Sequence, residues 1–220
     1  QSVVSVTNSE VSRVQGDGIT VSSPVGIPTV TGNTVNNAGY NAIRVSSANI
    51  DFARLNGNSG SGNQFNAVAL ESDTVTVSSS LPWSGNLIPL LWGGCSSVTI
   101  APSVTVTLNP GTVIKGGNHS CGGLYVQGSL VGAGTVANPV VLTSWRDDSV
   151  GGDTNGDGNA TGPTNTDWYG VQSSPAGNGN PDPTINLDRV KISWASTGVS
   201  ASQSVVSVTN SEVSRVQGDG

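Results

Sequence analysis

The chain ends with the same residues with which it begins. Residues 1–18 and residues 203–220 both read QSVVSVTNSEVSRVQGDG, so the sequence repeats after 202 residues. An identity of this length indicates a recent tandem duplication or a piece of a periodic polymer. Such a chain needs a fold that continues beyond its own end. A solenoid of stacked coils meets this requirement, whereas a closed barrel or sandwich does not.

The composition favours short β-strands and excludes several classes of function. Charged residues make up 10% of the chain, against about 25% in an ordinary soluble domain. Val, Ile, Thr and Ser are abundant and suit strands better than helices. The net charge of −6 argues against nucleic-acid binding, and no apolar run is long enough for a transmembrane helix. With no Met and no signal peptide, we expect a mature piece of a longer protein.

Short apolar runs, each closed by Gly, Asn, Asp, Ser or Pro, predict many strands of three to six residues. No stretch of ten residues has the periodicity of an amphipathic helix without interruption by Gly or Pro. The predicted strands cover residues 3–7, 18–21, 42–45, 67–70, 74–77, 97–100, 105–108, 123–126, 139–142, 168–171 and 187–192.

Two similar units, residues 6–11 (VTNSEV) and 30–35 (VTGNTV), place Asn at turn positions. Asn tolerates the left-handed conformation of tight corners, and strands without long crossover helices pair in parallel only by coiling. We therefore predict an all-β, single parallel β-helix (β-solenoid) of about eight to ten coils, stackable end to end. Residues 1–202 form one period, which would rise roughly 40–50 Å. Residues 203–220 begin the next period or act as a complementing strand.

An ordered series of segments carries a resemblance to a known family. The segments are residues 109–115 (NPGTVIK), 124–130 (LYVQGSL), 137–144 (ANPVVLTS), 152–158 (GDTNGDG) and 167–170 (DWYG). This series resembles the secreted right-handed parallel β-helix repeat proteins of bacterial surfaces, adhesin-type proteins with a DxNxDG calcium loop. The resemblance implies right-handed coiling and an extracellular or cell-surface location, and it implies no particular activity.

The sharpest chemical motif is DxNxDG at residues 153–158, which places three oxygen-bearing side chains at alternate positions before a Gly. Ca²⁺ prefers such oxygen ligands. The twelfth position is Thr164 rather than Glu, so the loop is not an EF-hand. Without a cation the clustered carboxylates would repel one another, whereas the alternative is a solvated acidic turn. The predicted calcium ligands are Asp153, Asn155, Asp157, the carbonyl of Asn159, Asp147, Asp148 and Asp167, and the ion would pin an excursion over residues 146–167.

The two cysteines, Cys95 and Cys121, lie far apart in the sequence and belong to no CxxC or Cys/His cluster, which argues against zinc. They form either a disulfide between neighbouring layers or two buried thiols. A disulfide would imply an oxidising, extracellular setting.

The sequence favours a structural function over an enzymatic one. We expect a repeat unit of an extracellular filament, stalk or cell-surface adhesin shaft, whose partners are neighbouring copies of the same repeat. Those copies are either covalently continuous or separate subunits. The alternative is a polysaccharide-binding or lyase-like β-helix. A lyase needs acidic groups and an Arg or Lys base, and Arg146 beside Asp147 and Asp148 is the only local combination of this kind. Five tryptophans are either sugar platforms or packing residues, with Trp168 and Trp194 inside the coil and Trp83 and Trp145 over ends and loops.

Overall fold

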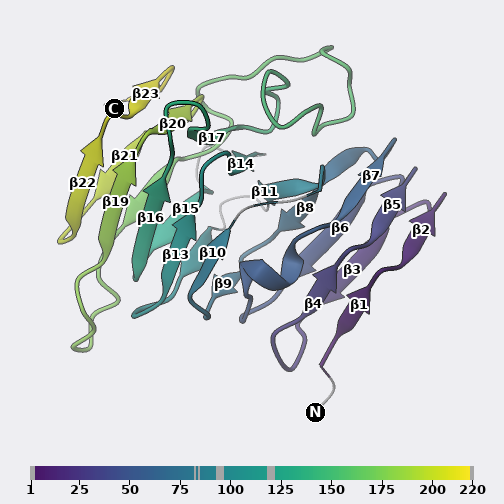
Figure 1. Ribbon diagram of the computed structural model, residues 1–220, viewed down its shortest axis with the longest axis horizontal. Helices are drawn as coiled ribbons and strands as arrows, with labels where there is room; N and C mark the ends of the chain where they lie inside the picture. The colour runs from purple at the N-terminus through teal and green to yellow at the C-terminus, as the bar shows by residue number, and fades with distance from the viewer. Residues whose placement is uncertain (1–2, 82, 84, 93–96, 118–121, 219–220) are drawn as a thin grey trace.

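The computed structural model describes residues 3–81, 83, 85–92, 97–117 and 122–218, and these form a parallel β-solenoid of about eight turns (Figure 1). Every strand pair is parallel, as expected where the chain coils in one direction. The described residues contain no α-helix, and a single 3-10 turn, η1 (Phe52–Leu55), is the only helical element among them. The predicted fold class is confirmed. Cys95 and Cys121 lie outside the described residues.

One face of the solenoid is an eight-stranded sheet with one strand from each turn, in the order β23-β20-β17-β14-β11-β8-β6-β3. Its strands are β3 (Ile19–Ser22), β6 (Asn41–Ser46), β8 (Phe65–Leu70), β11 (Ile88–Leu91), β14 (Val113–Gly116), β17 (Val140–Ser144), β20 (Val190–Ser193) and β23 (Glu212–Ser214).

A second face begins with the pair β1 (Ser5–Thr7) and β4 (Thr29–Thr31) and continues, beyond η1, as a five-stranded sheet. Because η1 contacts both β4 and β10, it occupies the place of a strand on this face. The five strands are β10 (Ser79–Leu81), β13 (Thr105–Leu108), β16 (Ser129–Ala133), β19 (Thr184–Asp188) and β22 (Val205–Thr209).

Two further sheets complete the cross-section. The first turns carry β2 (Glu10–Ser12), β5 (Thr34–Asn36) and β7 (Ser59–Ser61), and the later turns carry a five-stranded sheet. That later sheet holds β9 (Thr74–Val75), β12 (Val98–Ile100), β15 (Leu124–Val126), β18 (Val171–Ser173) and β21 (Val199–Ala201).

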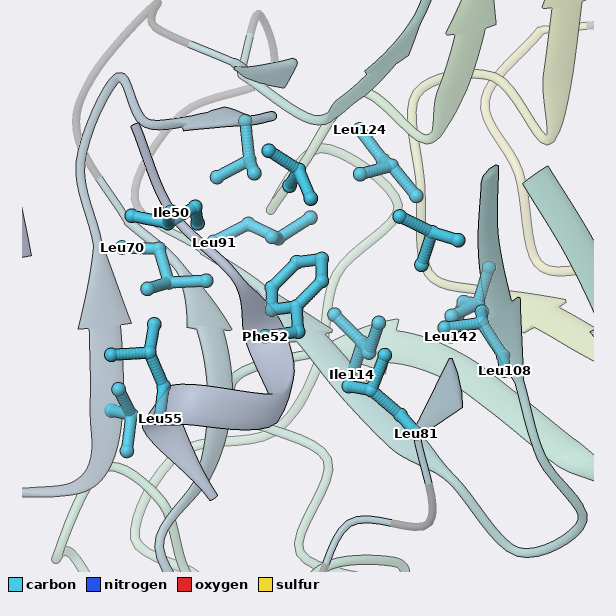
Figure 2. Packing of buried hydrophobic residues seen from close by; sticks show 14 of the residues in the cluster. Ile50, Phe52, Leu55, Leu70, Leu81, Leu91, Leu108, Ile114, Leu124 and Leu142 are labelled. Carbon is cyan, nitrogen blue, oxygen red and sulfur yellow. The ribbon is translucent and has the colours of Figure 1, made fainter. Parts of the chain in front are cut away.

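Alternate strand residues point inward and stack into one continuous core, because the side chains of parallel in-register strands lie directly above one another. Figure 2 shows Phe52 of η1 surrounded by side chains that include Leu81, Leu91 and Ile114. Phe52 is fully buried, so η1 contributes to the core like the strands it replaces.

The corners use the residues that the sequence predicted. The two units at residues 6–11 and 30–35 stack in register, with Val6 opposite Val30 and Val11 opposite Val35. Asn8 and Gly32 take positive φ angles of 49° and 68° at this corner. Beside them, fully buried Asn33 and Asn58 form a ladder in which the Asn33 N–H donates to Asn58 Oδ1 at 3.0 Å. Such satisfied buried amides fix the register of successive turns.

Eight turns is the lower end of the predicted range, because one turn contains a long excursion. Thr143 and Ser193 are neighbours on adjacent turns and are 50 residues apart in the sequence, whereas the ladder residues Asn33 and Asn58 are 25 apart. The eighth strand of the largest sheet, β23, belongs to the second copy of the repeated sequence, so one 202-residue period contributes seven turns. At about 4.8 Å per turn such a period rises about 34 Å, less than the 40–50 Å expected from the sequence.

Candidate metal centre

The chain leaves the solenoid after β17 and returns at Trp168, which bridges to Ala195 of the next turn. In Figure 1 this excursion, residues 145–167, is the long green loop that extends over the top of the sheet. Part of the sheet's outer surface is apolar and buried, forming a second small core of Phe65, Ala67, Ala69, Leu90 and Trp92, with Trp145 packed against it. The outer surface of β8 and β11 is therefore buried as well as their inner surface.

Hydrogen bonds from the sheet hold the excursion in place. The Asn66 N–H donates to the Thr154 carbonyl at 2.8 Å, and Asn66 Nδ2 donates to the Asp153 carbonyl at 3.1 Å. The Lys115 ammonium, fully buried on β14, donates to the Gly152 carbonyl at 2.7 Å. These contacts fix the acidic loop relative to the sheet.

The excursion brings Asp148, Asp153 and Asp157 together, with one carboxylate oxygen from each within 4.8 Å of the others. Hydrogen bonds within the loop set this geometry: the Gly158 N–H donates to Asp153 Oδ2 at 2.9 Å, and the Ala160 N–H donates to Asp157 Oδ1 at 3.0 Å. We call these three residues the aspartate triad.

The electrostatics of the triad follow from burial and from neighbouring charges. Burial raises the pKa of Asp148, and the carboxylate of Asp153 raises it further. Hydrogen bonds lower the pKa of Asp157, that from Thr161 most strongly. Burial lowers the pKa of Lys115 to about 8, although the carboxylates of Asp148, Asp147 and Asp153 oppose this effect. The single ammonium therefore compensates only part of the triad's negative charge.

Two buried oxygens at the triad suit a cation. Asp148 Oδ1 and Asn155 Oδ1 are buried and have no hydrogen-bond partner among the described residues. Buried polar atoms are rarely left unpaired, and a ligand or ion is one way of pairing them. All the donor atoms here are carboxylate or amide oxygens, the set that hard divalent cations prefer. The aspartate triad is thus a possible metal site.

The remaining predicted ligands lie around the triad in other roles. Asp147 accepts hydrogen bonds from Thr143 Oγ1 and Ser149, and the Asn159 N–H donates to Asp157 Oδ1 at 3.1 Å. Asp167 does not belong to the aspartate triad.

Asp167 closes the base of the excursion. It lies 3.1 Å from Arg146 Nη1 and accepts hydrogen bonds from Ser144 Oγ and from Thr164. Arg146 also lies over the ring of Trp145, with 4.8 Å from its Cζ atom to the ring centroid. These contacts give Asp167 a structural role at the point where the excursion leaves and rejoins the solenoid.

Sequence reasoning did not identify Lys115, because no motif links it to the distant loop that covers it. It lies next to Ile114 on β14. In a solenoid without a covering loop, the outer face of such a strand is exposed to solvent. Only the path of the excursion shows that its side chain is covered.

Comparisons with family models, with curated proteins and with solved structures find no match to this chain. In the part of the chain that the structure describes, no helix has the length and apolar character needed to cross a membrane. The structure shows a parallel β-solenoid and the aspartate triad, and these features assign the chain to no family.

Proposed function

We propose that the chain is the structural repeat unit of an extracellular filament, stalk or adhesin shaft, in which solenoids continue end to end. One observation supports this most strongly: the described residues of the two copies of the repeated segment, which lie within residues 3–18 and 203–218, have matching corners and use opposite edges for pairing.

The conformations match at the strands and at the corners. The first copy forms β1 and β2, and the second forms β22 and β23; β2 and β23 span equivalent residues, and β22 begins two residues before the counterpart of β1 and ends at the equivalent residue. Asn8 and Asn210 have φ angles of 49° and 50°, and Arg13 and Arg215 have φ angles of 57° and 54°. The repeated segment therefore acts as one coil module with a fixed shape.

The pairing partners lie on opposite sides of the module. The first copy pairs with the turn that follows it, through β4 and β5, and the second pairs with the turn that precedes it, through β19 and β20. A strand inside a parallel sheet uses both edges, so one copy could make both sets of bonds at once. A single coil of this sequence would then join the end of one period to the start of the next.

Ser9 and its counterpart Ser211 illustrate this compatibility at the level of atoms. The Ser9 N–H donates to Asn33 Oδ1 of the following turn at 3.0 Å, whereas Ser211 Oγ accepts from the Val190 N–H of the preceding turn at 3.0 Å. Because these bonds use different atoms of the same residue, they do not compete.

Apolar exposure at the last described turn favours the same interpretation. Val206 and Val208 are each 42% exposed, whereas their counterparts in the first copy, Val4 and Val6, are partly buried against the core. A further turn stacked on β22 would cover these side chains and pair an otherwise open strand edge.

Calcium is the metal we propose for the aspartate triad. Asp148, Asp153 and Asp157 would hold it, with Asn155 Oδ1 as a further ligand, and bound calcium would neutralise the clustered charge. Its role would be structural, because the loop that it orders covers the second core. The calcium loop and the resemblance to secreted repeat proteins support an extracellular location.

The lyase-like alternative receives less support. Lys115 is fully buried, and Arg146 is engaged by Asp167 and Trp145, so neither cation is placed to act as a base on a polysaccharide. We therefore favour a non-enzymatic function.

The test compares residues 1–202 with residues 1–220. We expect residues 1–202 to assemble into filaments, because β19 and β20 would accept residues 1–18 of the next copy as they accept residues 203–220 here. A free peptide with the sequence of residues 203–220 should cap this edge and stop growth measured by light scattering, whereas a scrambled peptide should not. Val11→Asp within residues 1–202 should also prevent assembly. Monomers of residues 1–202, or growth that ignores the peptide, would contradict the proposal.

A further inference from the structure

A groove of about 610 Å³ lies on the outer face of the eight-stranded sheet, where the excursion forms one of its sides. Its floor comes from β20 and β23, which present Lys191, Ser193, Glu212 and Ser214, and Asp147 contributes to its wall. A second hollow of about 600 Å³ shares Lys191 and Glu212 with it. The two hollows therefore adjoin one another at β20 and β23.

Two charged side chains of this groove are available to a ligand. Lys191 and Glu212 are register partners on adjacent strands. Within the described part of the chain, neither of them takes part in an ion pair or a side-chain hydrogen bond. The two acids and two bases that line the first hollow, Asp147, Glu212, Lys191 and Arg215, leave no net charge there, and Arg189 of the second hollow is paired with Asp188.

Trp194 supplies an aromatic surface with a fixed orientation. It follows β20 at a corner where its φ angle is 58°, a conformation that is rare for a bulky residue. The guanidinium of Arg215 on the next turn lies over its ring, with 5.0 Å from Cζ to the centroid. Trp194 was predicted to lie inside the coil. The structure instead places it at the groove, partly buried, because the corner turns its side chain outward.

We propose that this groove binds a neutral, linear oligosaccharide. A sugar ring has apolar faces that stack on an aromatic side chain and a polar rim that hydrogen-bonds to charged groups. Trp194 would support one ring on the face that Arg215 does not cover, and the Glu212 carboxylate and Lys191 ammonium would bind neighbouring hydroxyls. The balanced charge gives no advantage to an acidic or basic ligand, and two adjoining hollows of about 600 Å³ each leave room for more than one ring.

The proposal does not depend on end-to-end stacking, because the groove is complete within one chain. In a stacked array it would recur once per period, since Glu212, Ser214 and Arg215 belong to the repeated sequence. Failure of either proposal would leave the other in place.

The test measures binding of neutral hexasaccharides of glucose, mannose and galactose to residues 1–220 by calorimetry and by ligand-observed NMR, with calcium present. The chain provides a matched control, because Glu10 is the counterpart of Glu212 in the first copy and does not line the groove. We expect Glu212→Gln to weaken binding at least tenfold and Trp194→Ala to abolish it, whereas Glu10→Gln should leave it unchanged.

Three outcomes would overturn the proposal. They are no binding of any neutral hexasaccharide at 10 mM, equal effects of Glu212→Gln and Glu10→Gln, and tighter binding of an oligogalacturonate or of an extended peptide than of every neutral sugar. If Trp194→Ala fails to fold, the pair of Glu→Gln variants still decides the matter.

Discussion

Asp73 offers the most direct test of how burial in the core changes the pKa of a carboxyl group. It lies at 0% exposure after β8, and its Oδ1 accepts a hydrogen bond from the Ser47 N–H at 2.5 Å. Its Oδ2 is buried without a hydrogen-bond partner among the described residues. Burial is the largest influence and raises the pKa of Asp73 to about 7, from an ordinary value of 3.8, although backbone hydrogen bonds from Ser47 and Glu71 oppose this rise.

The size and sign of the effect follow from proton linkage. A rise from 3.8 to about 7 corresponds to about 4 kcal/mol. Because the folded state holds this proton more tightly than the unfolded state, the free energy of unfolding falls as pH rises from about 4 to about 7. Above pH 7 the folded protein bears the whole penalty of a buried carboxylate.

Asp73→Asn should remove this penalty. A buried Asn side chain can satisfy its hydrogen bonds in this solenoid, as Asn63 shows: its Oδ1 accepts from the Ala38 N–H, and its Nδ2 donates to the Val35 carbonyl. We expect the variant to be more stable than the parent by about 1–4 kcal/mol at pH 8 and close to it at pH 4.

Guanidinium denaturation followed by circular dichroism at pH 4, 6 and 8 measures this difference directly. Comparing the variant with the parent at each pH cancels the titration of all other groups. Asp182→Asn, at an exposed turn, is the control and should show no pH-dependent difference. The reasoning would be refuted if Asp73→Asn and its parent lost stability in parallel between pH 4 and pH 8.

Three further predictions concern the metal centre and the packing of the turns. Chelation of calcium should lower the melting temperature, because calcium at 100 times its Kd contributes about 2.7 kcal/mol to stability. Asp157→Ala should abolish this sensitivity to chelator. A parent protein whose melting temperature does not respond to chelator would exclude the metal. Lys115→Met should tighten calcium binding in calorimetry, because a buried cation near the triad is removed, and unchanged or weaker binding would count against this charge balance. Gly60→Ala should destabilise the folded protein by about 3 kcal/mol or more, because a Cβ there would lie 1.8 Å from the Val35 carbonyl oxygen. Gly16→Ala is the control: its Cβ would meet no atom within 4 Å, so the melting temperature should not change.

Local patterns in the sequence were sufficient to predict the coil type and the Asn-containing corners of the first turns, whereas residues 187–192, predicted as one strand, contain a corner at Arg189 between β19 and β20. The units at residues 6–11 and 30–35 stack in the register that their similarity indicates, because side-chain alternation and Asn corners are properties of a few consecutive residues. β11 (Ile88–Leu91) was not predicted: both of its faces are buried, so its apolar residues do not alternate with polar ones.

The sequence predicts the part of the candidate site that lies within a single loop. The spacing of Asp153 and Asp157 within one loop indicates a cation, and both belong to the aspartate triad. The role of Asp167, the covering of Lys115 and the position of Trp194 depend on the path of the excursion and on the orientation of a corner. Both are set by packing between distant segments, to which no short motif refers.

The central claim is that one coil of the repeated segment joins successive solenoid periods. Electron cryo-microscopy of filaments formed by residues 1–202 tests it most directly, because seven turns at about 4.8 Å each give a rise of about 34 Å per subunit. We predict a filament with this axial repeat and an unbroken stack of turns across each joint. A filament with a different rise, or subunits in contact through their sides rather than their ends, would contradict the account.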